Sequence, residues 1–230
     1  EQAKMAPGPL IQVDNVHKSF LMGKEAVQAL RGVTLEVLPG EIICLMGPSG
    51  SGKTTLLNIV GGLEEPSRGH VIVDGENVVA LSEDKLSEMR LTRMGFVFQS
   101  YNLLANFTAR ENVEVPMALA GLGRRERRRR VEQLLQSVGL ADRARHYPSE
   151  LSGGQQQRVA IARALANDPP ILIGDEITGD LDSETGFEVM EVVARLNRER
   201  GTTVVYVTHD PRMAKFAHRV IQLRDGRIVD

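Results

Sequence analysis

The stretch Gly47-Pro48-Ser49-Gly50-Ser51-Gly52-Lys53-Thr54 restricts the possible folds more than any other feature of this sequence. It matches the spacing Gly-x-x-x-x-Gly-Lys-Ser/Thr, follows the apolar run 42–46, and precedes residues 55–63, which place apolar side chains on one helical face. We therefore predict a buried strand, a glycine-rich turn and a helix in this order. Such a turn directs backbone N–H groups and the positive end of the helix towards one point, which is the geometry of an anion site.

Lys53 and Thr54 add specific chemistry to this turn. The lysine ammonium supplies a positive charge for the outer phosphates of a nucleotide, and the threonine hydroxyl is a suitable ligand for Mg²⁺. A plain glycine-rich turn with a surface lysine is the alternative interpretation. The complete match between an apolar strand and an amphipathic helix favours phosphate binding.

The composition is that of a globular chain with nearly balanced charge. The 230 residues are 42% apolar, enough for the core of one large or two-lobed domain, and the net charge of −2 gives no reason to expect nucleic acid. The single cysteine, Cys44, lies in an apolar run, so we expect a buried, reduced thiol. No apolar run approaches a bilayer span and no signal-peptide pattern is present, so we expect a soluble chain that reaches a membrane through a partner.

Three more apolar segments, predicted to be strands, end in polar residues that suit a reaction. Residues 95–98 lead to Gln99, residues 171–174 lead to Asp175 and Glu176, and residues 202–207 lead to Thr208 and His209. Ligands of α/β sheets gather at such strand ends. Adjacent acids on a strand point to opposite sides, so Asp175 suits a water-mediated contact with Mg²⁺ and Glu176 suits the polarisation of an attacking water.

Residues 102–166 change in character and are predicted to be mostly helical. The run 124–130 holds six arginines and one glutamate, which is typical of a solvated helix face, with contact to a membrane surface or an acidic partner as the sharper alternative. Leu151-Ser152-Gly153-Gly154-Gln155 precedes a strong helix former and so predicts a second anion site. A simple N-cap would explain Ser152 but not two adjacent glycines, which weaken a helix unless something must approach closely.

The residues alone leave one position open and predict one further turn. Phe20, between the first strands, suits either the core or a flat platform for a purine base. Gly179 to Asp182 is predicted to form a turn, after which Ser183 suits the N-cap of the next helix.

The set and order of these features resemble the ATP-binding cassette (ABC) ATPases over nearly the whole chain. The pentad 151–155 beside a phosphate loop is highly specific for that family, and residues 44–55 and 151–165 resemble its lipoprotein-release, macrolide-efflux and cell-division branch. The resemblance implies an α/β fold: a P-loop NTPase (RecA-like) core with an antiparallel β subdomain, and a helical subdomain that carries the LSGGQ signature. The expected single domain spans 1–230, with the core at 1–98 and 167–230 and the helical part at 99–166.

The resemblance also implies a role for each matching position. Catalysis would involve Glu176, which orients or activates water, His209, which contacts the γ-phosphate, and Gln99. Thr54 and Gln99 would coordinate Mg²⁺, with Asp175 supporting it through water. The ATP contacts implied within one chain are adenine stacking by Phe20 and phosphate binding by Gly47, Pro48, Ser49, Gly50, Ser51, Gly52, Lys53, Thr54 and Thr55. The contacts implied with the ATP of a second subunit come from Ser152, Gly154, Gln155 and Asp182.

The expected function is that of a Mg²⁺-dependent ATPase subunit that powers a membrane complex, with export of a lipid, lipoprotein, peptide or drug as the expected activity. Its expected partners are a transmembrane permease subunit in a separate chain and a second copy of itself, with no nucleic acid. Two anion sites on one chain can serve one nucleotide if two copies pack head to tail. The expected location is cytoplasmic, on the inner face of the membrane. The surface near 99–106, with apolar residues Tyr101, Leu103, Leu104 and Phe107, suits either the docking of a partner helix or packing between the lobes.

One alternative stays open at this level: a division or envelope-signalling ATPase that drives a periplasmic partner through a membrane protein without moving a solute. DNA-repair relatives insert long coiled coils or metal modules, which this chain lacks, and a GTPase would carry an Asn-Lys-x-Asp motif, which is absent. The chain departs from the family pattern at Ile177, where proline is usual, at Gly174, where alanine is commoner, and at Asp180, where related cassettes often have asparagine or alanine. Ile177 could loosen the backbone after Glu176 and alter turnover.

Overall fold

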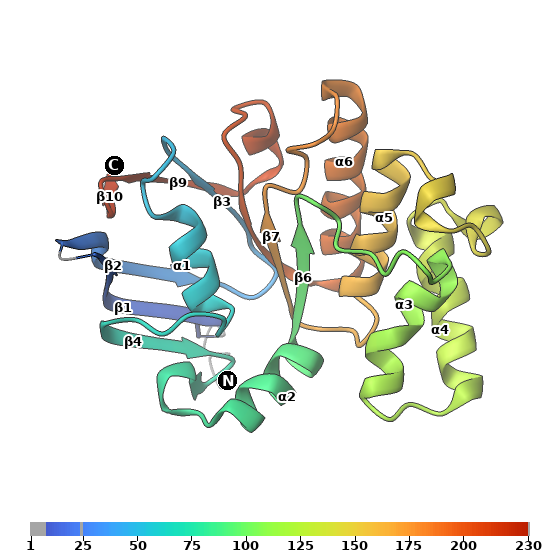
Figure 1. Ribbon diagram of the computed structural model, residues 1–230, viewed down its shortest axis with the longest axis horizontal. Helices are drawn as coiled ribbons and strands as arrows, with labels where there is room; N and C mark the ends of the chain where they lie inside the picture. The colour runs from blue at the N-terminus through green and yellow to red at the C-terminus, as the bar shows by residue number, and fades with distance from the viewer. Residues whose placement is uncertain (1–7, 24, 230) are drawn as a thin grey trace, which may run out of the picture.

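The computed structural model describes residues 8–23 and 25–229, in which strands form two sheets (Figure 1). The antiparallel sheet has the order β2-β1-β4-β5, and the second sheet has the order β10-β9-β3-β8-β7-β6. The strands are β1 (Ile11–Met22), β2 (Glu25–Val37), β3 (Ile42–Met46), β4 (Arg68–Val73), β5 (Glu76–Asn77), β6 (Met94–Phe98), β7 (Ile171–Asp175), β8 (Thr203–Val207), β9 (Arg219–Arg224) and β10 (Arg227–Val229). The predicted α/β architecture is confirmed.

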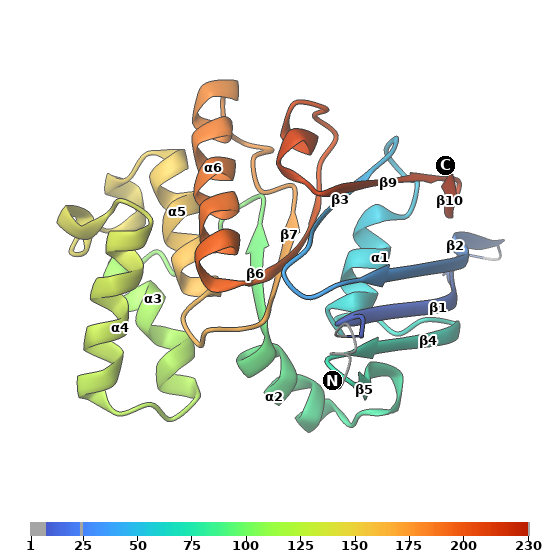
Figure 2. The same cartoon turned by 180° about the vertical axis from the view of Figure 1, so that it is seen from behind.

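The helices lie on both faces of the second sheet and beside it. The α-helices are α1 (Lys53–Val60), α2 (Glu83–Arg93), α3 (Ala109–Leu119), α4 (Arg124–Ser137), α5 (Gly153–Ala164) and α6 (Ser183–Arg200). Four short 3₁₀ turns are η1 (Val78–Ala80), η2 (Ala141–Arg143), η3 (Pro148–Glu150) and η4 (Met213–Phe216). Figure 2 shows α6 across the face opposite α1, with α3, α4 and α5 grouped to one side. Between β6 and β7 the chain is helical wherever it is regular.

The strand directions explain why the predicted site residues can meet. β3, β8, β7 and β6 are neighbours and run parallel, so their carboxyl ends lie at one edge of the sheet. The phosphate loop follows β3, Glu176 follows β7, and Gln99 follows β6. Register places Phe98 beside Asp175 and Asp175 beside Val207. The loops that carry the chemistry are therefore side by side.

Two hydrophobic clusters hold this edge in place. One fills the space around α1 between the two sheets, and it includes Val13, Leu56 and Val205. The other packs α6 and the helical segment against the opposite face of the second sheet. Cys44 belongs to this second cluster and is fully buried, as expected, and its burial raises the pKa of the thiol to about 11.

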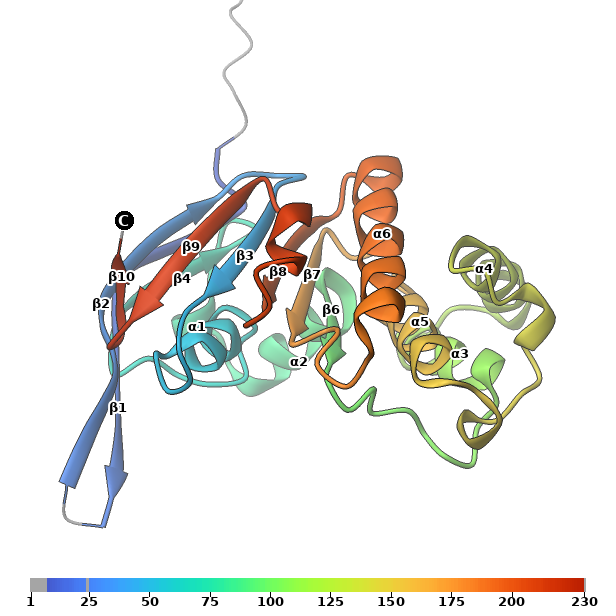
Figure 3. The same ribbon diagram turned by 90° about the horizontal axis from the view of Figure 1, so that it is seen from above.

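The β1–β2 hairpin extends beyond the rest of the molecule (Figure 3). Its register pairs Phe20 with Val27. None of the helices in the described part of the chain is long and apolar enough to cross a membrane.

Four of the six arginines in the run 124–130 form ion pairs at the surface of α4. Arg127 pairs with Glu114, Arg128 with Glu132, and both Arg129 and Arg130 with Glu126. Hydrogen bonds from these last two arginines lower the pKa of Glu126 to about 2. The pairing supports the interpretation of a solvated helix face.

Candidate nucleotide-binding and hydrolysis site

The phosphate loop closes tightly because two of its glycines have no room for a side chain. Gly52 is the N-cap of α1 with φ of 101°, and a Cβ atom there would lie 2.5 Å from the carbonyl oxygen of Ala29. At Gly47, with φ of 150°, a Cβ atom would lie 2.0 Å from the carbonyl oxygen of Leu223. Any other residue at either position would push the loop away from the strands behind it.

Lys53 is folded into this loop rather than extended into solvent. Only 8% of the residue is exposed. Its Nζ donates hydrogen bonds to the carbonyl oxygens of Gly47 and Pro48, both at 2.8 Å, and lies 3.4 Å from Ser51 Oγ. Ser51 itself is buried. The loop thus holds the ammonium at its own centre, where an outer phosphate would be bound.

A cavity of about 560 Å³ opens in front of the loop and is large enough for a nucleotide. Most of the predicted ATP-binding residues line it, together with both residues expected to act on the γ-phosphate: Phe20, Gly47, Ser49, Gly50, Gly52, Lys53, Thr54, Thr55, Glu176 and His209. Sequence reasoning missed Val27, Gln28 and Ala29, which β2 brings to the cavity opposite Phe20. No local pattern in the sequence marks these three residues.

Phe20 is a wall of this cavity and not a core residue. The residue is 37% exposed, and the Lys18 ammonium lies 4.9 Å from the centroid of its ring. Lys18 also forms an ion pair with Glu64 at 2.5 Å. The lysine therefore fixes the ring in a position that suits stacking on a base.

Two oxygen donors meet where a metal ion is expected. Thr54 Oγ1 donates a hydrogen bond to Asp175 Oδ1 at 3.3 Å. Burial raises the pKa of Asp175, and this effect is partly offset by the hydrogen bond from Thr54. No cluster of three or more His, Cys, Asp or Glu side chains that could hold a metal ion is present within residues 8–23 and 25–229. The pair fits Mg²⁺, which is typically held by few protein oxygens together with substrate phosphates and water.

Glu176 and His209 are in contact with each other in the lining of the same cavity. His209 Nδ1 lies 3.3 Å from Glu176 Oε1. Glu176 has φ of 49°, in the left-handed region, and its N–H donates to the carbonyl oxygen of Val207 at 3.2 Å. The side chain of His209 is 68% exposed and that of Glu176 is 30% exposed. The carboxylate can accept a proton from a water molecule that enters the cavity from outside.

Gln99 does not share the cavity in this structure. Its Nε2 donates a hydrogen bond to Asp180 Oδ1 at 2.6 Å, and its side chain packs against Gly179. Gln99 is absent from the cavity lining, although Phe98 before it pairs with Asp175. The structure thus brings Thr54 and Asp175 together and turns the Gln99 amide towards Asp180.

The pentad 151–155 forms a capping box at the start of α5. The Gln155 N–H donates to Ser152 Oγ at 3.3 Å, and the Ser152 N–H donates to Gln155 Oε1 at 3.0 Å. These bonds use acceptor atoms, so the hydroxyl proton of Ser152 and the amide protons of Gln155 remain available to a ligand. Ser152 is exposed, and the described cavity lining contains no residue of the pentad.

The glycines of the pentad have an explanation within the chain. A Cβ atom at Gly154 would lie 2.3 Å from Thr185 Cγ2 on α6, and one at Gly153 would lie 2.8 Å from the hydroxyl of Tyr101. Close packing between α5 and α6 therefore requires Gly154, whatever ligand the pentad binds.

Asp182 is the N-cap of α6, so the prediction that Ser183 would cap this helix is wrong. Asp182 Oδ1 accepts hydrogen bonds from the backbone N–H groups of Glu184 and Thr185 at 3.1 and 3.0 Å. The hydrogen bonds from Thr185, together with the backbone hydrogen bond from Glu184, lower the pKa of Asp182. Ser183 is the first residue of the helix.

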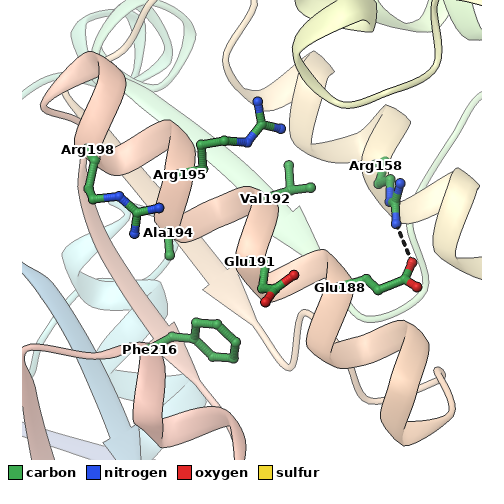
Figure 4. Close-up of a pocket in the computed structure, with 8 residues that line it drawn as sticks. All are labelled: Arg158, Glu188, Glu191, Val192, Ala194, Arg195, Arg198 and Phe216. Atoms are coloured by element: carbon green, nitrogen blue, oxygen red, sulfur yellow. Dashed lines mark hydrogen bonds and ion pairs between the residues drawn. The ribbon is translucent and has the colours of Figure 1, made fainter.

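A second hollow, of about 640 Å³, lies away from the nucleotide cavity (Figure 4). It is lined by residues of α5, α6 and η4, and it includes none of the predicted site residues. Arg158 is paired there with Glu188 at 2.6 Å, as Figure 4 shows. This hollow is larger than the nucleotide cavity, so volume alone does not identify the functional site in this fold.

A glycine-rich loop between a parallel strand and a helix, a buried lysine in that loop, and a carboxylate beside the cavity define a phosphate-loop nucleoside triphosphatase. The family model described as ABC transporter matches residues 30–179. The chain belongs to the ABC transporter family, as its ATP-binding, ATP-hydrolysing cassette.

The relatives agree with this assignment. A Thermotoga maritima ABC transporter ATP-binding protein is 50% identical over 219 residues, which are 95% of this chain and 93% of that protein. The Escherichia coli K12 macrolide export ATP-binding/permease protein MacB is 48% identical over 96% of this chain, which spans only 34% of MacB.

Solved structures of ATP-binding cassettes are also similar to this chain in fold and in sequence. The cassette MJ0796 in a dimeric structure has a TM-score of 0.88 and 47% identity, with 96% of this chain and 97% of that chain covered. Its dimeric post-hydrolysis state bound to ADP and Pi has a TM-score of 0.87 and 46% identity, with the same coverage.

Proposed function

We propose that this cassette powers a membrane exporter by forming an ATP-dependent, head-to-tail homodimer. The observation that carries the proposal is the orientation of the pentad, whose free donors at Ser152 and Gln155 lie outside the chain's own nucleotide cavity. A second copy could bring those donors to the γ-phosphate held by the first. In this scheme residues 1–98 and 167–230 act as the nucleotide-binding core, and residues 99–166 act as the helical lobe that meets the partner.

The predicted site residues in and beside the cavity each have a defined task in this proposal. Phe20 stacks on adenine, and the loop N–H groups and Lys53 hold the phosphates. Thr54 would bind Mg²⁺ directly, with Asp175 acting through water, and Gln99 would join them after leaving Asp180. The bound Mg²⁺ would neutralise charge on the phosphates. Glu176 accepts a proton from the attacking water, and His209, beside it, donates a hydrogen bond to the γ-phosphate.

A groove between the core and the helical lobe supports the proposed membrane partner. It has a volume of about 460 Å³ and is lined by apolar residues such as Met94, Phe96 and Phe98, with the 71% exposed Leu119 beside them. An amphipathic helix of a permease fits such a surface. From the segment 99–106 only Asn102 lines this groove, so the proposed docking surface lies mainly on β6, α2, α3 and the end of α5.

The nature of the relatives favours export at the inner face of a membrane. MacB is named as a macrolide export protein with ATP-binding and permease functions in one chain, and another similar structure belongs to the cbiONQ transporter complex. We propose that the permease of this cassette is a separate chain. The signalling alternative has no specific support from the site.

The dimer is tested by replacing the proposed base. Glu176→Gln keeps the shape of the side chain but cannot accept the proton from water, so ATP should stay bound and hold two copies together. Light scattering after size exclusion, with ATP and Mg²⁺, should give the mass of a dimer for this variant, and ADP with Mg²⁺ should give a monomer. A variant that binds ATP and stays monomeric at all tested concentrations would refute the head-to-tail scheme.

A further inference from the structure

The backbone of Glu176 lies in a conformation that its surroundings must maintain. Its φ of 49° is in the left-handed region, where residues with a Cβ atom are rarely found. The carbonyl oxygen of Glu176 accepts a hydrogen bond from the Gly179 N–H at 2.9 Å, inside the same loop. From outside the loop, the carbonyl oxygen of Val207 accepts a hydrogen bond from the Glu176 N–H at 3.2 Å, and three residues behind Glu176 add to this support.

Ile177 and Gly174 fit together as a matched pair. Ile177 is only 2% exposed. A Cβ atom at Gly174 would lie 2.4 Å from Ile177 Cδ1 and 2.5 Å from Ile177 Cγ1. The isoleucine side chain thus fills the space that any side chain on β7 at position 174 would need. The residue after Glu176 is therefore closely packed against β7.

Gln157 ties this loop to the neighbouring one. It is fully buried on α5, and its Nε2 donates to the carbonyl oxygen of Ile177 at 2.5 Å and to that of Phe98 at 3.3 Å. Phe98 immediately precedes Gln99. The Oε1 atom of Gln157 is buried without a partner in the described structure. A buried amide oxygen without a hydrogen-bond partner destabilises the folded chain. The two hydrogen bonds donated by Nε2 offer a reason why a glutamine is nevertheless buried at this position.

We infer that Gln157, Gly174 and Ile177 form a clamp behind the catalytic loop that holds Glu176 in its left-handed conformation. The three are positioning residues, since none of them lines the nucleotide cavity. Because Ser152 caps α5, the clamp also ties the backbone of Glu176 to the helix whose tip has the proposed contact with the second copy. The inference rests on the proposed role of Glu176, but the clamp itself is present without nucleotide.

Hydrogen exchange of the nucleotide-free chain tests the clamp directly. In Gln157→Met the side chain keeps its length but loses both hydrogen bonds of its donor, and the loss of the one to Ile177 should make the amides of residues 176–181 exchange about tenfold faster. Gln156→Met is the matched control: it removes the Gln156 Nε2 hydrogen bond to the carbonyl oxygen of Leu151 from the same helix. Unchanged exchange in Gln157→Met, or equal acceleration in the control, would overturn the clamp.

Kinetics separate positioning from general stability. Gln157→Met should lower kcat about 10- to 100-fold, as expected for a displaced base, while the Kd for ATP stays within error of the unmodified chain. If Gly174→Ala impairs turnover by striking Ile177, then adding Ile177→Ala should restore part of it, with Ile177→Val as a milder second variant. Additive losses in the double variant would show that the two residues are not a matched pair.

A failure of the clamp is distinguishable from a failure of the proposed function. The exchange experiment uses no nucleotide, whereas the dimer experiment measures the mass of Glu176→Gln with ATP. Slow exchange with a normal ATP-dependent dimer would remove the clamp alone. Fast exchange in Gln157→Met without any ATP-dependent dimer would remove the head-to-tail scheme and leave the clamp.

Discussion

The role of Lys53 can be tested with a magnitude derived from its contacts. A lysine ammonium has three protons to donate. Two of them reach the carbonyl oxygens of Gly47 and Pro48 at 2.8 Å, and the third points only weakly at Ser51 Oγ, 3.4 Å away. One proton is therefore available for a phosphate oxygen without any change in the loop. Lys53→Ala should remove one charge-assisted hydrogen bond.

The expected loss follows from the strength of that bond. A hydrogen bond to a charged group contributes about 1.5–3 kcal/mol, which corresponds to a rise of about 10- to 150-fold in the Kd for ATP. Titration with a fluorescent ATP analogue in the presence of a chelator measures this without a contribution from metal ions. Lys85→Ala, an exposed lysine on α2, is the matched control for loss of charge. A change in Kd of less than about twofold, well below the expected range, would refute the assignment of this loop.

Two further variants test the second anion site and the buried acid. Ser152→Arg should leave ATP binding by one chain intact but block hydrolysis. The variant loses the free hydroxyl, and its bulky cation would meet the neighbouring copy. Normal hydrolysis would show that the pentad only caps α5. Asp175→Asn should raise the melting temperature of the nucleotide-free chain at neutral pH and reduce the stabilisation that Mg²⁺ adds to that by ATP. Burial raises the pKa of Asp175 above its ordinary value of 3.8, so the folded chain loses stability as pH rises through the folded-state pKa, and asparagine removes this loss. Melting curves between pH 4 and 8 measure it, and a less stable variant at neutral pH without metal would contradict it.

The strand ends were the part of the site that the sequence predicted well. Each of the loops that lead to Lys53, Glu176 and His209 directly follows a short apolar segment, and such segments form neighbouring parallel strands. The alignment of their carboxyl ends then follows from topology alone. This is why residues more than a hundred positions apart, such as Thr54 and Asp175, are in contact.

Features that depend on pairs of distant side chains could not be predicted. The contact between Gln99 and Asp180 joins loops 81 residues apart, and nothing near either residue indicates the partner. The sequence attributed the pentad glycines to a close approach, but only the structure identifies Thr185 as the neighbour of Gly154. Gln157 had a weak signal: it is a polar residue on the same helix face as Ala160 and Ile161, both fully buried.

The exposure of the catalytic pair shows what a second copy must contribute. The cradle is already formed in one chain, because Lys53 is buried and both flanking glycines are tightly packed. Glu176 and His209, in contrast, remain 30% and 68% exposed, so water screens them and charge on the γ-phosphate would be poorly stabilised. Within residues 8–23 and 25–229, the rest of the cavity lining comes from β1, β2 and the phosphate loop with the start of α1. Covering them with the donors of a neighbouring α5 tip strengthens their interactions with phosphate without any change in the cradle. Closure by the partner is therefore the step that would convert a nucleotide-binding chain into an efficient hydrolase.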